Sequence, residues 1–249
     1  MTNETREVDL AHPELLTAGA AAIRVHLNLA QIEQFQRYYL ELVDWNSRVN
    51  LTSIKEWEQV QIRLFLDSLS VIMAVPSGLL KAGRFVDVGS GAGFPGLALK
   101  IAFPGIDVTL IEATAKKTAF LNHLKETLGL PDVGILTGRS ETLAHDLQLR
   151  EGFDVVLARA LARMNALAEL TLPFCRPGGI VIAQKSAGVE DEVTQARKAI
   201  ETMGGVLREV KELAIPELER QTTLVVLEKV NPTPERYPRQ PGMPAKRPI

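Results

Sequence analysis

The chain has 249 residues, of which 46% are apolar and 23% charged, and its formal net charge is −2. This composition excludes a disordered chain, and no apolar run is long enough to span a bilayer, so we expect a soluble globular protein with no membrane partner. The sequence starts with acidic residues and does not resemble a secretory signal peptide. We therefore expect the protein in the cytoplasm. Cys175 is the only cysteine and the four histidines are scattered, so the sequence predicts neither a disulfide nor a metal site.

Residues 1–83 are predicted to form an N-terminal helical region. Apolar residues recur at helical spacing from Leu29 to Trp45, and again from about Glu56 to Met73. The polar run between them, residues 45–52, has the local pattern of a helix end with an asparagine cap. We therefore expect this region to be a helical cap that precedes the main domain.

Residues 84–230 follow a different pattern, in which short apolar runs alternate five times with longer amphipathic runs. Such alternation is typical of βαβ units, so we predict an α/β, Rossmann-like fold with a mainly parallel sheet and helices on both faces. Two final strand-like runs, Val206–Leu213 and Thr223–Val230, have no helix between them and predict an antiparallel last strand. The other expected strands are 85–88, 108–111, 133–136, 153–157 and 180–184, and the expected helices are 95–102, 115–128, 141–149, 164–172 and 190–203.

Residues 231–249 form a tail that contains six prolines. Because proline lacks a main-chain N–H and suits neither helix interiors nor sheets, we predict that the tail is disordered. Its four basic residues against one acidic residue make it a candidate for contact with a phosphate backbone, although the net charge argues against a globally basic nucleic-acid binder. If the tail is disordered, deleting it would leave the stability of the domain nearly unchanged.

A glycine-rich turn follows the first predicted strand, within residues 85–96. Such a turn lies at the carboxyl ends of the strands, where α/β folds bind their ligands. Glu112 lies 21 residues after Gly91, just past the second strand, where a carboxylate can accept hydrogen bonds from both ribose hydroxyls. The turn therefore predicts a ligand that contains a nucleoside.

Two cofactors compete for this turn. Gly91-x-Gly93-x-x-Gly96 formally matches the dinucleotide fingerprint. The longer pattern at 87–93, Asp-x-Gly-x-Gly-x-Gly, resembles the first motif of class I S-adenosylmethionine (SAM) methyltransferases, where the acid suits a cationic sulfonium better than a pyrophosphate. The Leu-Pro and Pro-Gly-Gly groups within residues 172–179 resemble a later motif of the same superfamily. We therefore expect SAM as the cofactor, with a nicotinamide dinucleotide as the alternative.

The residues after the fourth predicted strand narrow the class of methyl acceptor. Enzymes that methylate exocyclic amines of bases usually carry Asp/Asn-Pro-Pro-aromatic there, whereas this chain has Ala158-Arg159-Ala160-Leu161. Methylation of a pyrimidine carbon in RNA needs a cysteine nucleophile, and Cys175 is expected instead to be a small buried residue. We therefore expect an acceptor with its own lone pair, such as a ring nitrogen.

Three runs carry a resemblance to one family: Trp45-Asn-x-x-x-Asn-Leu-Thr52, Arg63-x-x-x-Asp-Ser-Leu69 and the glycine turn 87–96. With shorter matches at 138–141, 159–160 and 219–220, they make residues 29–230 resemble RsmG, formerly glucose-inhibited division protein B (GidB). The resemblance implies a SAM-dependent enzyme that methylates N7 of a guanine in a conserved loop of 16S small-subunit rRNA, on naked rRNA or on the ribosomal subunit.

One departure from the family pattern is Leu64, which stands where the family usually has histidine and puts any role of that histidine in doubt. We expect a monomer. A methyltransferase of another RNA or of a small molecule, and a nucleotide-binding module without turnover, are the alternative hypotheses.

The glycine turn and the resemblance together imply a set of cofactor-binding residues. These are Asp87, Gly89, Gly91, Gly93, Phe94, Glu112, Ala113, Thr114, Ser140, Glu141 and Arg159. Side chains suited to phosphate or guanine contacts are candidates for RNA binding, namely Asn46, Arg48, Asn50, Arg63, Lys185, Arg197 and Arg220. Arg159, Lys185 and Arg220 are candidates for positioning the reacting groups, and the catalytic residues are otherwise unassigned.

Overall fold

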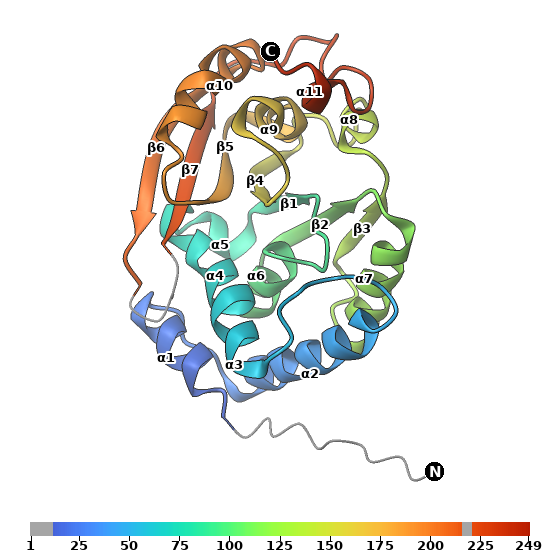
Figure 1. Cartoon of the computed structure of the whole chain (residues 1–249), viewed down its shortest axis with the longest axis vertical. Coiled ribbons are helices and arrows are strands. Elements are labelled where there is room, and N and C mark those ends of the chain that lie inside the picture. Colours follow the sequence, from blue (N-terminus) through green and yellow to red (C-terminus); the bar gives the residue numbers. More distant parts are fainter. Residues whose placement is uncertain (1–11, 216–220) are drawn as a thin grey trace.

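A mixed sheet carries the fold, with the strand order β3-β2-β1-β4-β5-β7-β6 (Figure 1). The computed structural model describes residues 12–215 and 221–249. Strands β1 to β5 are parallel to their neighbours among themselves, and β7 is antiparallel to both β5 and β6, as predicted. The strands are β1 (Arg84–Val88), β2 (Asp107–Glu112), β3 (Gly134–Thr137), β4 (Phe153–Arg159), β5 (Cys175–Ser186), β6 (Gly205–Leu213) and β7 (Thr222–Lys229).

Helices cover both faces of the sheet, with α2, α3, α6 and α7 on one side and α9 and α10 on the other (Figure 1). Within the described ranges, no helix is long and apolar enough to cross a membrane. The longer helices are α1 (Glu14–Ala22), α2 (Leu29–Asn46), α6 (Gly96–Ala102), α7 (Ala115–Thr127), α9 (Met164–Thr171) and α10 (Glu190–Thr202). The shorter ones are α3 (Trp57–Val60), the π-helical turn η1 (Gln61–Leu66), α4 (Asp67–Leu69), η2 (Ser70–Ala74), α5 (Leu79–Ala82), α8 (Ser140–Leu143), η3 (Leu172–Phe174) and α11 (Met243–Lys246).

Alternate residues of the central strands pack into two different cores. In β4, Val155 and Leu157 belong to the core shared with the N-terminal helices, whereas Val156 and Ala158 belong to the core under α9 and α10. Successive side chains of a strand point to opposite faces, and both faces are covered here. This double burial explains why the predicted strands are continuous apolar runs.

The predicted N-terminal helical region shares the first of these cores. Phe35 and Tyr38 of α2 lie 4.8 and 5.3 Å from Phe65 of η1, measured between ring centroids. Tyr38 also stacks on Phe94 of the glycine turn, at 5.0 Å with an interplanar angle of 4°. Residues 12–83 are therefore a layer of the same folded unit, and their aromatic rings pack directly against the glycine turn.

Two predicted helices differ from the structure. The helix expected at 56–73 is present as successive helical turns, but η1 widens its middle into a π-helical turn, a form that is often found at functional positions. The helix expected at 141–149 is wrong beyond Leu143. Asp146 Oδ1 accepts the N–H of Gln148 at 2.8 Å, and a local bond of this kind competes with helical hydrogen bonding.

The prediction of a disordered tail is wrong. Residues 231–249 follow a defined path beside α8 and α9 and include the short helix α11 (Figure 1). The guanidinium and main-chain N–H of Arg239 donate to the fully buried carboxylate of Glu169 at distances between 2.6 and 3.2 Å. His145 Nε2 lies 2.8 Å from the carbonyl oxygen of Pro238. Prolines are compatible with this path because the main-chain N–H groups that hold the tail belong to other residues, namely Thr233, Arg239 and Gly242.

A chain that ends at Val230 is expected to melt at a lower temperature than the full chain. Truncation leaves Glu169 buried without Arg239, and breaking a buried ion pair costs roughly 3–5 kcal/mol, or about 6–20 °C for a protein of this size. Melting followed by circular dichroism checks this, with the exposed tail residue Arg236 changed in Arg236→Ala as the control. Equal melting temperatures for the truncated and full chains would show that the tail adds no stability.

Candidate cofactor site

A hollow of about 280 Å³ opens at the carboxyl ends of β1 to β4, beside the glycine turn. Ligands of open α/β sheets bind at this edge. The segments that follow the four strands form most of its wall, together with one residue of α9 and one of α11. They are Val88–Gly89, Ile111–Thr114, Gly138–Glu141, Ala160–Ala162, Leu170 and Ala245.

Glu112 is an acidic residue of this wall, at the end of β2. Its Oε2 accepts the N–H of Gly91 at 3.0 Å, and its Oε1 accepts the N–H of Thr114 at 2.8 Å. A carboxylate oxygen can accept two hydrogen bonds, so each oxygen retains acceptor capacity. The main chain therefore orients a carboxylate that can receive a pair of neighbouring hydroxyl groups, as in a ribose.

The backbone around the hollow adopts conformations that bring other groups close. Gly93 has a φ of +97°, and a Cβ there would lie 2.6 Å from the hydroxyl oxygen of Tyr38. Ala160, the residue after β4, has a φ of +51°, which is uncommon for a residue with a side chain. Such conformations concentrate at binding sites, because the surrounding structure must hold them in place.

Six predicted cofactor-binding residues line the hollow: Gly89, Glu112, Ala113, Thr114, Ser140 and Glu141. Gly91 lies beside it and contacts Glu112, and Gly93 packs under Tyr38. Phe94 is buried against Tyr38 and does not belong to the wall. The structure therefore brings together the segments after β1, β2 and β3, as expected, but places Phe94 in the core behind the turn.

Asp87 also lies outside the wall, contrary to its predicted position. Its Oδ2 accepts the N–H of Gly96, the first residue of α6, at 2.8 Å, and its Oδ1 has no partner within residues 12–215 and 221–249. Burial raises the pKa of Asp87 to about 7, although the hydrogen bond from Gly96 and the charge of Arg159 lower it. Asp87 thus supports the start of α6 from beneath the glycine turn.

Asp67 is a residue that the sequence analysis did not select as part of the site. Its Oδ2 lies 3.0 Å from Nη2 of Arg159, and its Oδ1 accepts the hydroxyl of Thr222 at 2.7 Å. Its main-chain carbonyl accepts a hydrogen bond from the side chain of Gln184, also at 2.7 Å. Asp67 therefore joins the ends of β4, β5 and β7 that lie at one edge of the sheet.

Arg159 was expected in the cofactor site, and the structure directs its guanidinium toward the N-terminal helices instead. Besides Asp67, it contacts the main-chain carbonyl of Arg63 at 2.6 Å. The main-chain carbonyl of Arg63 and the carboxylate of Asp67 thus present two acceptors to the same guanidinium. The signal that the sequence offered for Asp67 was its place in the run 63–69 that carries the family resemblance.

Two candidate RNA-binding residues have structural partners. The Nζ of Lys185 donates to the carbonyl of Ala162 at 2.8 Å and lies 2.6 Å from Glu192, so Lys185 supports the wall of the hollow. The side chain of Asn46 bonds the main chain of Leu51 and Thr52 at 2.8–3.0 Å and thereby closes the loop after α2. The asparagine-capped helix end is the arrangement that the structure shows for Asn46.

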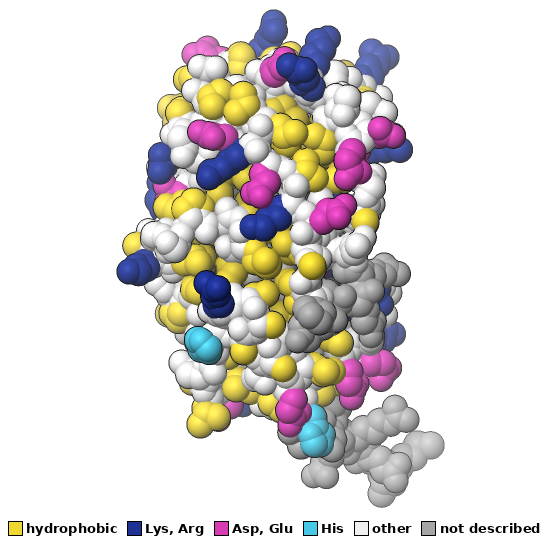
Figure 2. Space-filling view, turned by 90° about the vertical axis from the view of Figure 1, so that its left-hand side faces the viewer, with side chains coloured by type: hydrophobic (Ala, Val, Ile, Leu, Met, Phe, Trp, Pro, Cys, Tyr) yellow, Lys and Arg dark blue, Asp and Glu magenta, His cyan; other side chains and the backbone are white. Residues whose placement is uncertain are grey.

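The remaining candidates are spread over the surface. Arg48 pairs with Asp44, Arg197 pairs with Glu201 at 2.9 Å, and Asn50 is exposed. Arg220 lies outside the described residues. Figure 2 shows one face of the molecule, on which basic and acidic side chains are interspersed and several basic ones gather at the end that holds α10 and the C-terminus.

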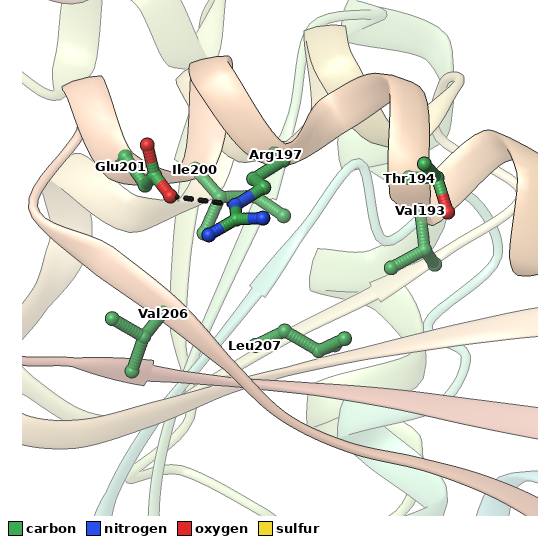
Figure 3. Close-up of a pocket in the computed structure, with 7 residues that line it drawn as sticks. All are labelled: Val193, Thr194, Arg197, Ile200, Glu201, Val206 and Leu207. Atoms are coloured by element: carbon green, nitrogen blue, oxygen red, sulfur yellow. Dashed lines mark hydrogen bonds and ion pairs between the residues drawn. The ribbon is translucent and has the colours of Figure 1, made fainter.

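A second hollow lies between α10 and β6, away from the residues that line the first one (Figure 3). Its volume is about 410 Å³, and its apolar wall is formed by residues such as Val193, Ile200 and Leu207. The ion pair of Arg197 and Glu201 lies at this hollow (Figure 3). Arg197 is thus not part of the cofactor site.

Comparison with known proteins identifies the family. The family model of rRNA small subunit methyltransferase G (GidB) matches residues 31–223. The chain belongs to this family. The Ribosomal RNA small subunit methyltransferase G of Dehalococcoides mccartyi (strain CBDB1) is 48% identical over 234 residues, which cover 94% of this chain and 98% of that protein. That of Roseiflexus sp. (strain RS-1) is 48% identical over 239 residues, which cover 95% and 99%.

Solved structures show the same fold at low sequence identity. MtNAS, solved in complex with MTA and tNA, matches with a TM-score of 0.54 and 18% identity over 80% of this chain and 71% of that chain. The antibiotic-resistance methyltransferase Kmr matches with a TM-score of 0.51 and 16% identity over 62% and 91%. The predicted class I SAM methyltransferase fold is thereby confirmed. As a family member, the chain is a SAM-dependent methyltransferase of small-subunit rRNA.

The titration of Asp87 gives a testable pH dependence for this methyltransferase. When folding raises the pKa of an acid, the free energy of unfolding falls as pH rises from the unfolded-state pKa to the folded-state pKa. Above the folded-state pKa it no longer changes. Because that value is about 7, we expect the free energy of unfolding to fall by roughly 2–3 kcal/mol from about pH 5 to about pH 8, relative to Asp87→Asn.

Urea denaturation at a series of pH values measures this difference. The variant Asp107→Asn, which changes an exposed carboxylate at the start of β2, is the control and should follow the wild type. Parallel pH profiles for the wild type and Asp87→Asn would contradict a raised pKa of Asp87.

Proposed function

We propose that this methyltransferase transfers the methyl group of SAM to N7 of a guanine in 16S rRNA, at the carboxyl edge of β1, β2 and β4. The observation that carries the proposal is the hollow beside the glycine turn, with the oriented carboxylate of Glu112 in its wall. The fold and the family supply the class of reaction. The site residues and the acceptor atom are the parts that we propose.

The wall of the hollow fits the adenosine half of the cofactor. Glu112 has acceptor capacity for the two ribose hydroxyls, and Gly89 allows close approach of a ligand to the main chain. Ser140 and Glu141, after β3, are proposed to meet the edge of the adenine. When bound, the cofactor supplies a methyl group that is already activated by a cationic sulfonium. The residues of the chain therefore need only to bind, to orient and to exclude water.

The surroundings of Cys175 support an acceptor that reacts through its own lone pair. Cys175 is fully buried, and burial raises the pKa of its thiol to about 12. A neutral buried thiol cannot act as the nucleophile that carbon methylation requires. Residues 158–161, at the end of β4, contain none of the prolines found in enzymes that methylate exocyclic amines. N7 of guanine carries an exposed lone pair in the plane of its ring and needs no such help.

Arg159 is proposed to position the reacting groups. A guanidinium has five N–H groups, and both contacts to Asp67 and Arg63 involve Nη2. The other nitrogens retain donor capacity toward a guanine or a carboxylate at the end of β4. Lys185 would act on the same site indirectly, since it supports the main chain at Ala162. Arg220 remains a proposed positioning residue.

For RNA binding we propose Asn46, Asn50 and Arg63, near the first layer of helices, and the exposed pairs that contain Arg48 and Arg197. Exposed ion pairs contribute little to stability, so a phosphate group can replace their carboxylate partners at little cost. The rRNA or the small ribosomal subunit is the partner. We further propose that the protein acts as a monomer in the cytoplasm.

Glu112→Ala is expected to weaken the binding of S-adenosylhomocysteine by about ten- to a hundredfold, because a charge-assisted hydrogen bond contributes roughly 1.5–3 kcal/mol. Calorimetric titration of the folded variant measures this change. Asp107→Ala, at the opposite end of the same strand, is the matched control and should bind like the wild type. Wild-type affinity in Glu112→Ala would remove Glu112 from the site.

The acceptor atom is tested with 16S rRNA and SAM that carries a labelled methyl group. Borohydride reduction followed by aniline breaks RNA at N7-methylguanine, so we expect the label and the break to coincide at a single guanine. Label on the RNA without a break would contradict N7 as the acceptor.

Cys175→Ser should retain methyl transfer to within a few-fold in the same assay, because its neutral thiol takes no part in the reaction. The control is Cys175→Ala, which removes the polar atom altogether at the same position. A folded Cys175→Ser variant that loses several orders of magnitude in rate would show that the thiol reacts.

A further inference from the structure

The C-terminal segment, defined here as residues 236–249, reaches the rim of the cofactor hollow. Ala245 of α11 belongs to the wall, next to residues that follow β3 and β4. The main-chain N–H of Gly242 donates to Oε1 of Glu141 at 2.8 Å. The family model ends at residue 223, so these contacts lie beyond the matched region. A segment distant in sequence from the glycine turn thus contributes directly to the hollow.

Glu141 depends on this contact because its side chain is almost fully buried, with 1% exposed. A buried carboxylate needs hydrogen-bond donors in place of water. Oε1 receives two of them, the N–H of Gly242 and, at 2.9 Å, Nη2 of Arg139. Burial raises the pKa of Glu141, but the hydrogen bonds from Arg139 and Gly242 outweigh it and lower the pKa. The tail therefore helps to keep Glu141 charged and in a fixed orientation.

The segment is also held in place by contacts with α9 and with the residues that follow α8. Arg239 and the fully buried Glu169 form a bidentate pair, and Pro238 is anchored through His145. Charge-assisted pairs of this geometry are among the stronger contacts in proteins. Because Arg239 lies only three residues before Gly242, the pair also fixes where the N–H of Gly242 points.

We propose that the C-terminal segment is part of the cofactor site, and that Arg239 and Gly242 are positioning residues that hold Glu141 and complete the rim. Arg239 and Gly242 affect the affinity for the adenosine half of the cofactor and not the rate of methyl transfer. The reason is that their contacts are with Glu169 and Glu141, and not with Arg159. The inference rests on the proposed cofactor site. It assigns to residues 236–249 a role in cofactor binding in place of contact with phosphate.

Cofactor binding and docking of the C-terminal segment must influence each other equally. If the docked segment strengthens cofactor binding, bound cofactor must stabilise docking by the same free energy. S-adenosylhomocysteine should therefore slow amide hydrogen exchange within residues 236–249 of the full chain, including the N–H of Gly242. A structural role of the tail alone would leave that exchange rate unchanged.

The test compares calorimetric affinities for S-adenosylhomocysteine among full-length variants. Arg239→Ala should bind at least about tenfold more weakly, with a raised KM for SAM and little change in kcat. Arg236→Ala, an exposed neighbour, is the control and should bind like the wild type. Ala245→Phe keeps the pair of Arg239 and Glu169 but intrudes at the rim, so it should weaken binding without lowering the melting temperature.

Glu112→Ala is included as a reference for the proposed site itself. If it weakens binding while Arg239→Ala and Ala245→Phe bind like the wild type, the inference is overturned and the proposed site stands. If all three variants bind like the wild type, both fail. The inference would also be overturned if S-adenosylhomocysteine left the rate of amide hydrogen exchange in the C-terminal segment unchanged.

Discussion

The carboxylate of Asp67 is the contact on which the geometry of the site most depends. Asp67 belongs to the N-terminal helices, yet its carboxylate contacts Arg159 of β4 and Thr222 of β7, and its main-chain carbonyl accepts a hydrogen bond from Gln184 of β5. These strands end or begin at the edge where the cofactor hollow opens. A partly buried guanidinium requires such a partner, because an uncompensated charge in the interior is costly. Asp67 thus fixes the end of β4 and, through it, the backbone that begins at the strained Ala160.

The same edge receives contributions from all three parts of the chain. The N-terminal helices supply Asp67 and the ring of Tyr38 behind the glycine turn, and the central residues supply the strand ends. The C-terminal segment supplies Ala245 and the N–H of Gly242. The three predicted divisions, 1–83, 84–230 and 231–249, are therefore not independent at the site. Each of them contributes to the alignment of a residue near the hollow.

Local patterns predicted much of this arrangement. The alternation of strands and helices, the antiparallel end of the sheet and the positions of Gly89 and Glu112 follow from short-range spacing, which a sequence displays directly. Asp87 was predicted to line the cofactor site because the spacing of a motif does not show in which direction a side chain points. In the strand, Asp87 lies on the same face as Phe85, toward α6 and away from the opening.

Contacts between distant residues were beyond the sequence patterns. Nothing in the local sequence of Glu169 shows that Arg239 will neutralise it, since 70 residues separate them. The tail was therefore predicted to be disordered from its proline content alone, and its packing was missed. Asp67 was missed for the same reason, because its partner Arg159 comes from a distant strand. Burial of a charge is decided by its partner, and the partner is known only from the fold.

A double-mutant cycle on Asp67 and Arg159 tests most directly whether the N-terminal helices and the sheet form one unit at this edge. The variants are Asp67→Asn, Arg159→Gln and the double variant, with the free energy of unfolding and the affinity for S-adenosylhomocysteine as readouts. We expect a coupling of roughly 1–3 kcal/mol in the free energy of unfolding, and a double variant that loses less affinity than the two single losses combined. Additive effects in both readouts would show that the helices and the sheet are not coupled at this edge.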